Sequence, residues 1–217
     1  MQLRFRTQKR TKVTFFSSRN ALVKRMEKVA AAFVDPGSGW NQEGARVLPA
    51  GEACKSWQEL ERSLLWLHER NVSRSQVLAA VGGGAALDHA ALAASLYRRG
   101  LPLVLVPTTL LAMVDATLGG KTAIDGPGGL KNFAGTFYPA DEVWVCPELL
   151  SSLPARERIS GAGECLKTFW LAGKSRDSAL WDYLESGKVS AGLARMIRGS
   201  LEVKRKVVER DALDTKR

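Results

Sequence analysis

Two glycine-rich segments carry the residue types that could bind a phosphorylated ligand. The first, Gly82-Gly83-Gly84, follows an apolar run and precedes a helix-like pattern. Without Cβ atoms, backbone N–H groups can approach an anion, and a helix N-terminus favours negative charge. Taken alone, the pattern fits a tight turn equally well. It lacks the G-x-G-x-x-G spacing and an acid about twenty residues later, which disfavours an ordinary Rossmann dehydrogenase.

The second segment runs from Asp115 to Asn132 and contains five glycines and two lysines, with a Gly-Gly-Lys and a Gly-Gly-Leu-Lys sequence. Lysines and an amide on glycine-rich loops suit a ligand with phosphate or carboxylate groups. Each lysine by itself could equally be solvated loop charge. Asp88, one turn into the helix after the first segment, could reach a ligand or simply complement the helix dipole.

Metal chemistry has weaker support in the sequence. Glu164 and Lys167 are three residues apart and would share a helix face, which by itself favours a surface ion pair. The three cysteines, Cys54, Cys146 and Cys165, are widely spaced and fit no metal-binding pattern. Reduced thiols of a cytoplasmic protein are the simplest interpretation.

Composition excludes several classes of protein. The 217 residues are 45% hydrophobic and 25% charged, which excludes intrinsic disorder. The net charge of +10 comes almost entirely from residues 1–12 and 195–217. A nucleic-acid binder would more often carry a basic stripe on its folded body, so we expect no nucleic-acid partner. No apolar stretch reaches membrane-spanning length and no signal peptide is evident, so we expect a cytoplasmic protein without a membrane partner.

The elements that must position these residues alternate along the first part of the chain. We predict helices over residues 21–33, capped by Asn20, over residues 57–70, opened by Ser56 and Glu59 at capping-box spacing, and over residues 85–98. Predicted strands cover residues 13–16, 46–48, 76–81, 103–106 and 142–146. This alternation predicts an α/β fold, with a parallel sheet covered by helices on both faces.

The pattern changes after Pro147, where the strands stop. Helical patterns cover residues 154–171, 178–185 and 190–210. We therefore predict two domains: residues 1–150 as an α/β domain and residues 151–217 as the beginning of a helical one.

Taken together, the motifs resemble those of 3-dehydroquinate synthases, in the same order along nearly the whole chain. They are Pro49-Ala-Gly-Glu52-x-x-Lys55, Val81-Gly-Gly-Gly-x-x-x-Asp88, Tyr97-Arg-Arg99-Gly100, Pro107-Thr-Thr-Leu-Leu-Ala-Met-Val-Asp115, Gly119-Gly-Lys121-Thr122, Lys131-Asn132, Gly163-Glu164-x-x-Lys167 and Ser200-x-x-x-Lys204. Any one motif is weak, but the combination is specific. The resemblance implies a Rossmann-like NAD-binding domain followed by a helical domain.

The family is a lyase of the shikimate pathway, which leads to aromatic amino acids. It converts 3-deoxy-arabino-heptulosonate 7-phosphate to 3-dehydroquinate and phosphate with catalytic NAD and a divalent metal, zinc or cobalt. The resemblance implies that the cofactor site contains Asn20, Glu52, Lys55, Gly83, Gly84, Ala85, Asp88, Thr108, Thr109, Asp115, Lys121 and Lys131. It implies a catalytic set of Arg99, Asp115, Lys121, Asn132, Lys167 and Lys204, with Glu164 as a metal ligand. Arg99 would reach the active site of a neighbouring subunit, which implies a homodimer.

Some positions depart from the family pattern. The usual aspartate after the first strand is replaced in Ser17-Ser18-Arg19-Asn20, and Leu87 and Leu130 occupy unusual places. The family's metal-binding histidines would lie beyond Asp211, so we expect a fragment or a natural truncation with an incomplete metal site and no cyclase activity. The alternatives are another sugar-phosphate cyclase or, less favoured, a metal-dependent polyol or alcohol dehydrogenase of the same fold.

Overall fold

A parallel sheet of six strands forms the centre of the computed structural model, which describes residues 10–173 and 178–211. The strand order is β1-β8-β5-β4-β2-β3, and every neighbouring pair is parallel. The strands are β1 (Lys12–Phe15), β2 (Ala31–Val34), β3 (Arg46–Val47), β4 (Leu78–Gly82), β5 (Leu103–Pro107) and β8 (Glu142–Val145). The central strands β4 and β5 are buried along their whole length, as expected for a sheet covered on both faces.

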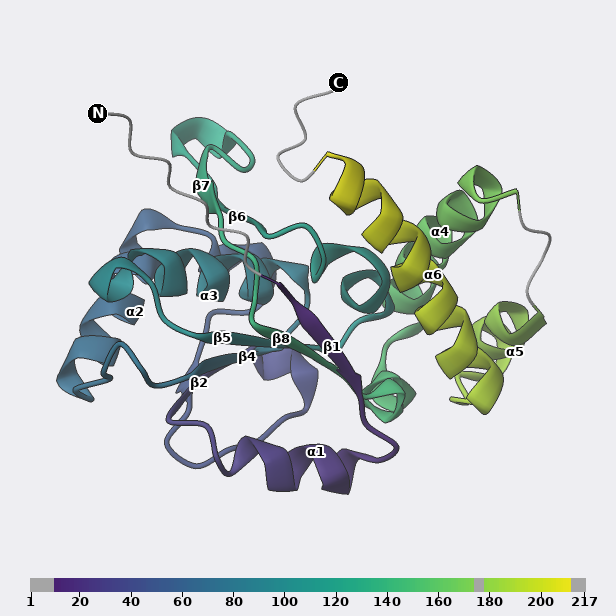
Figure 1. Cartoon of the computed structure of the whole chain (residues 1–217), viewed down its shortest axis with the longest axis horizontal. Helices are drawn as coiled ribbons and strands as arrows, with labels where there is room; N and C mark the ends of the chain where they lie inside the picture. Colours follow the sequence, from purple (N-terminus) through teal and green to yellow (C-terminus); the bar gives the residue numbers. More distant parts are fainter. Residues whose placement is uncertain (1–9, 174–177, 212–217) are drawn as a thin grey trace, which may run out of the picture.

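Helices cover the two faces of this sheet, which confirms the predicted α/β fold. Figure 1 shows α1 (Arg19–Met26) on one face and α2 (Trp57–Glu69) and α3 (Gly84–Leu96) on the other. The predicted cap of α2 is present, because the Ser56 side chain accepts a hydrogen bond from the Glu59 N–H. Helix α3 carries alanine and leucine on most of its surface and is almost entirely buried.

The helix predicted over residues 21–33 is wrong in its second half. Helix α1 ends at Met26, and residues 31–34 form β2, which lies between β4 and β3. The alanines of Ala31-Ala32-Phe33-Val34 favour a helix locally, but burial of all four side chains in a parallel sheet overrides that preference. The helix cap is also different: Ser18, not Asn20, accepts the Ala21 N–H.

The second glycine-rich segment is not a simple loop, as the sequence pattern suggested. It folds into an antiparallel hairpin of β6 (Lys121–Ile124) and β7 (Ala134–Phe137). Hydroxyl groups tie the hairpin to α3, since Thr136 contacts both Thr122 at 3.0 Å and Ser95 at 3.0 Å. The hairpin therefore carries the loop between Ile124 and Ala134 to a fixed place beside α3.

Three helices follow the last strand: α4 (Ala155–Leu171), α5 (Ser178–Ser186) and α6 (Ala191–Arg210). They pack on one another beyond one end of the sheet (Figure 1), and α4 and α6 contact a short π-helix, η4 (Ala112–Ala116). Gly161 permits this contact, because a Cβ there would lie 2.6 Å from the Leu110 Cβ. In the described ranges, no helix is both long and apolar enough to cross a membrane.

Candidate functional site

The turn between β4 and α3 has the geometry of an anion cradle. Gly83 is the N-cap of α3 and no side chain caps the helix, so N–H groups of its first turn have no partner from a capping side chain. Packing makes Gly82 obligatory, because a Cβ there would lie 2.7 Å from the Asp35 Cβ and 2.9 Å from the Ala86 Cβ. A Cβ on Gly83 would lie 3.3 Å from the Thr109 Cγ2, whereas one on Gly84 would meet only Ala116, at 3.8 Å.

Asp35 lies beside this turn, and sequence reasoning missed it. It follows β2, the neighbour of β4, and its Oδ2 accepts the Gly83 N–H at 3.4 Å. Its Oδ1 accepts the Gly37 N–H at 3.0 Å, which fixes the carboxylate at the carboxyl end of β2. The Asp35-Pro36-Gly37 sequence after an apolar run could have indicated a strand end, had β2 not been included in a helix.

Asn20 is not brought to the glycine turn. It lies in the first turn of α1 after the edge strand β1, and β8 and β5 separate β1 from β4. Ordinary strand spacing puts β1 and β4 about 14 Å apart. The structure thus places Asp35, rather than Asn20, next to the turn. Thr108 and Thr109 do lie there, since the Thr108 N–H donates to the Gly82 carbonyl at 2.9 Å.

Lys55, Asp88 and Asn132 meet in a partly buried cluster in front of α3. The Lys55 Nζ donates to Asp88 Oδ2 at 3.1 Å and to Asn132 Oδ1 at 2.5 Å, with the lysine only 6% exposed. Burial raises the pKa of the Asp88 carboxyl, although the nearby Lys55 ammonium opposes that rise. Lys55 thus connects two segments of the chain that are distant from it in sequence, one carrying Asp88 and the other carrying Asn132.

A second set of charges extends this cluster outwards. The Lys131 Nζ contacts Glu52 Oε2 at 2.9 Å and Asp125 Oδ2 at 2.8 Å. These hydrogen bonds raise the pKa of Lys131, with Asp125 as the larger cause. The two sets together form what we call the nucleotide-side cluster: Glu52, Lys55, Asp88, Asp125, Lys131 and Asn132.

The remaining charged candidates gather at the helices. Lys204 of α6 pairs with Asp115 in the π-helix η4, and Lys167 pairs with Glu164 in α4 at 2.6 Å. The Glu164 hydrogen bond raises the pKa of Lys167, and the charge of Asp115 adds to that rise. These four residues form the helix-side cluster. Because the charge of Asp115 affects the pKa of Lys167, the Lys204–Asp115 and Lys167–Glu164 pairs interact electrostatically.

Two predicted site residues are not among those that define the two clusters. Lys121 begins β6 opposite Phe137, with an exposed side chain. Arg99 is exposed and has a backbone φ of +65°, in the left-handed region. Ala85 is in the first turn of α3, directly after the glycine turn.

Glu164 is the one residue of this chain that the resemblance predicts as a metal ligand. Glu164 is bonded to Lys167, and among residues 10–173 and 178–211 no group of three His, Cys, Asp or Glu side chains could hold a metal ion. A catalytic zinc needs three protein ligands and an open position. The described residues alone therefore do not fit a complete metal centre.

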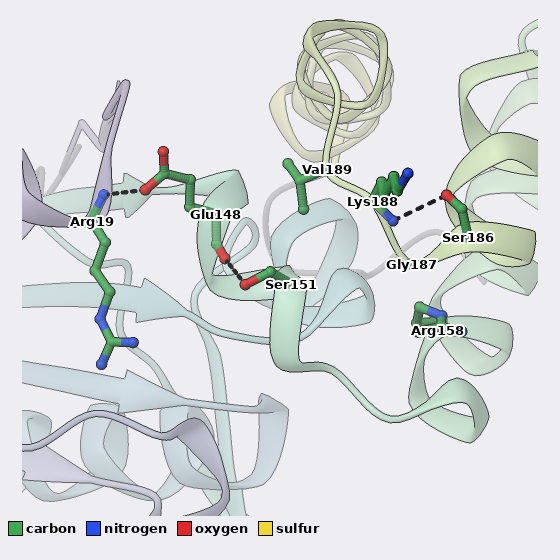
Figure 2. Close-up of a pocket in the computed structure, with 8 residues that line it drawn as sticks. All are labelled: Arg19, Glu148, Ser151, Arg158, Ser186, Gly187, Lys188 and Val189. Carbon is green, nitrogen blue, oxygen red and sulfur yellow. Dashed lines mark hydrogen bonds between the residues drawn. The ribbon is translucent and has the colours of Figure 1, made fainter.

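A cleft of about 720 Å³ lies between the start of α1 and the helices. Figure 2 shows hydrogen bonds between some of its polar groups: the Arg19 N–H donates to Glu148 at 2.7 Å and the Lys188 N–H to Ser186 at 3.1 Å. The Arg19 guanidinium extends away from the cleft and donates to the Gly39 carbonyl at 2.7 Å. Its lining residues all differ from those of the two clusters, so the candidate site is the glycine turn and its cluster.

Comparisons with known proteins show the family to which the chain belongs. The model of the 3-dehydroquinate synthase N-terminal family matches residues 45–160, more than half of the chain, and includes the glycine turn and the nucleotide-side cluster. The chain belongs to the 3-dehydroquinate synthase family. The 3-dehydroquinate synthase of Methylacidiphilum infernorum is 42% identical over 167 residues, which is 77% of this chain and 45% of that protein. The one from Cereibacter sphaeroides strain KD131 is 36% identical over 94% of this chain and 54% of its own length. The chain thus spans about half the length of the curated relatives it matches.

Solved structures show the same fold. A 2-epi-5-epi-valiolone synthase from Streptomyces hygroscopicus, with NAD+ and Zn2+ bound, has a TM-score of 0.83 at 21% identity, covering 100% of this chain and 66% of that one. A 2-deoxy-scyllo-inosose synthase, complexed with carbaglucose-6-phosphate, NAD+ and Co2+, has a TM-score of 0.78 at 23% identity, covering 94% and 61%. A probable glycerol dehydrogenase from Sinorhizobium meliloti reaches 0.68 at 18% identity, covering 91% and 65%.

Proposed function

We propose that this chain is the NAD-binding part of a 3-dehydroquinate synthase, acting on 3-deoxy-arabino-heptulosonate 7-phosphate. One observation carries the proposal: the glycine turn, Asp35 and the buried Lys55–Asp88 pair lie together where β2 and β4 end, in a chain of this family. The carboxyl ends of parallel strands are where doubly wound sheets bind ligands. We also propose the division into an α/β domain up to residue 150 and a helical domain from residue 151.

Several features of the turn between β4 and α3 suit NAD. The first-turn N–H groups of α3 suit the pyrophosphate, and the space that a Gly84 side chain would take is open. The Asp35 carboxylate is an acceptor for ribose hydroxyls, which is the usual role of an acid at a neighbouring strand end. When bound, NAD would accept a hydride from a ring alcohol and return it later. The chain's own residues bind the cofactor, orient it and exclude water from it.

The substrate would be held by charge. Lys121 and Asn132 are proposed for its phosphate, and Lys204 for its carboxylate end. Asp115 and Lys167 are proposed for the ring hydroxyls. Both lysines of the helix-side cluster are paired with carboxylates in the free protein, and these partly exposed pairs can exchange for a ligand at little cost. For the metal, zinc or cobalt, we propose Glu164 as the one ligand among the described residues.

Isothermal titration calorimetry with NAD tests the proposal directly. We expect binding with a stoichiometry of one per chain and no binding after the glycine turn is blocked. Absence of NAD binding by folded protein would overturn the proposal. The alternative, a polyol dehydrogenase of the same fold, makes a different prediction, because it would accumulate NADH from glycerol, whereas a cyclase returns NAD unchanged.

We also propose that the protein forms a homodimer through the surface next to Arg99. Leu101 and Leu103, which follow Arg99, are 1% and 0% exposed and so are not available to an interface. Exposed apolar side chains lie instead at Leu96, Phe133 and Phe137, at 47%, 58% and 47%. Sedimentation velocity on wild type and Phe137→Lys tests this: we expect a dimer that the lysine weakens, and a dimer unaffected by it contradicts the interface.

A further inference from the structure

Asp125 is the one acidic residue of the β6–β7 hairpin, and it forms several hydrogen bonds. Its Oδ1 accepts the Asn132 N–H at 2.8 Å and its Oδ2 accepts the Lys131 Nζ at 2.8 Å. Its own N–H donates to the Lys55 carbonyl at 2.8 Å. These bonds lower the pKa of the Asp125 carboxyl, the Lys131 contact being the larger cause, so it is a carboxylate at neutral pH.

The bond to Asn132 has a conformational consequence. Asn132 has a backbone φ of +52°, in the left-handed region that a residue with a side chain adopts at a cost. The Asp125 carboxylate accepts the N–H of this residue and so supports the conformation. In that conformation Asn132 Oδ1 reaches the buried Lys55 Nζ.

The rest of the loop offers little support of its own. Gly128 and Gly129 both have positive φ, at +69° and +83°, and a Cβ on either would meet nothing within 4 Å. Besides Asp125, one backbone bond closes the loop, from the Gly126 N–H to the Leu130 carbonyl at 2.7 Å. The Asp125 side chain thus joins the beginning of the loop to its end, and the Asp125 backbone N–H joins the loop to the segment carrying Lys55.

We propose that Asp125 is a positioning residue, which fixes Lys131 and Asn132 against Lys55 so that NAD and the substrate phosphate meet a prearranged set of groups. This inference rests on the proposed function. Asp125 itself touches neither ligand in the proposal and acts through the residues it holds. Its contribution is preorganisation, because a loop fixed before binding loses less entropy when the ligand arrives.

Two substitutions separate its two bonds. Asp125→Ala removes both acceptors, and we expect NAD binding to weaken about tenfold by calorimetry. Asp125→Asn keeps an oxygen for the Asn132 N–H but cannot accept from Lys131, so we expect a loss of about threefold or less. The control is Glu202→Gln, which removes an acid of similar charge from an exposed pair with Arg205 on α6 and should leave the dissociation constant unchanged.

Hydrogen exchange at the Asn132 amide gives a second readout that overall stability would not move. We expect faster exchange in Asp125→Ala than in Asp125→Asn or wild type, while amides of β4 keep their protection.

If wild type binds NAD and Asp125→Ala binds it equally well, or if Asn132 exchange is unchanged, the inference is overturned and the proposed function stands. If wild-type protein binds no NAD, the proposed function fails, and the inference fails with it. If Asp125→Ala does not fold, the comparison of Asp125→Asn with Lys131→Met decides, because equal effects support the inference and an effect confined to Lys131→Met overturns it.

Discussion

The nucleotide-side and helix-side clusters contain similar residues but hold them differently. Lys55 is 6% exposed and bonded to two side chains, Asp88 and Asn132. Lys167 and Lys204 have side chains that are 61% and 31% exposed, and each is paired with a single carboxylate in the interactions described above. A buried, multiply bonded lysine is fixed in place before any ligand arrives, whereas an exposed pair opens and closes cheaply. Under the proposed function, this difference would suit a cofactor that stays bound and a substrate that must enter and leave.

The largest expected effect comes from blocking the glycine turn. Gly83→Val would place branched carbon where the pyrophosphate must lie and press on Thr109, whose Cγ2 would be 3.3 Å from the new Cβ. We expect NAD affinity to fall more than about 100-fold by calorimetry, a loss of roughly 2.7 kcal/mol or more. Glu202→Gln on α6, in an exposed pair with Arg205, is the binding control, and circular dichroism of Gly83→Val checks that the variant folds. Wild-type affinity in folded Gly83→Val would show that the ligand binds elsewhere.

A pH titration should separate the two regions next. His89 of α3 is fully buried, its Nε2 lies 2.8 Å from the Ser63 hydroxyl, and burial lowers its pKa to about 4. The unfolded chain therefore binds this proton first as the pH falls, so stability is complete above pH 6.5 and declines towards pH 4 by up to about 3 kcal/mol. The Arg205 contact lowers the pKa of Glu202 in α6, so that pair keeps its charge to lower pH.

Urea unfolding between pH 4 and pH 7 measures this dependence, with hydrogen exchange comparing α3 and α6. We expect the free energy of unfolding to depend less on pH in His89→Gln than in wild type. Glutamine retains a hydrogen-bonding group for Ser63 but does not titrate in this range. Earlier loss of protection in α6 than in α3 on acidification would contradict the comparison. An unchanged slope in His89→Gln would remove His89 as its cause.

The smallest effects are expected from deleting single lysines. Lys55→Met leaves the partly buried Asp88 without its cation, and we expect a loss of about 2 kcal/mol in the free energy of unfolding. Lys204→Met removes a half-exposed partner of Asp115, with an expected cost below about 1 kcal/mol. Urea denaturation of the two variants gives the comparison directly. Equal costs would show that burial does not distinguish the clusters.

The sequence predicted those elements whose local signals agree with their tertiary setting. Ser56 and Glu59 marked the start of α2 correctly, because a capping box works without reference to the rest of the fold. The failure at Ala31–Val34 had the opposite cause, since its strand conformation depends on two neighbours, β4 and β3, that are distant in sequence. That error hid the strand end and therefore Asp35.

The candidate site shows the same division. The resemblance identified Lys55, Asp88 and Asn132, and the structure brings these three together. No local pattern indicated that Lys131 would bridge Glu52 and Asp125, because that contact depends on the hairpin turning back over residues 51–55. The roles of these residues, the homodimer and the cytoplasmic location remain predictions.

The pairing of β1 with β8 affects how the chain must fold as it leaves the ribosome. Lys12 pairs with Glu142 and Phe15 with Val145, so β1 has no partner among the described strands until β8 is synthesised. Until then, residues 12–15 stay unpaired and the edge of β5 beside the β8 position lies open. Contacts between such distant segments slow folding, because a long loop must close before they are gained. During synthesis this edge is therefore open to pairing with the wrong strand.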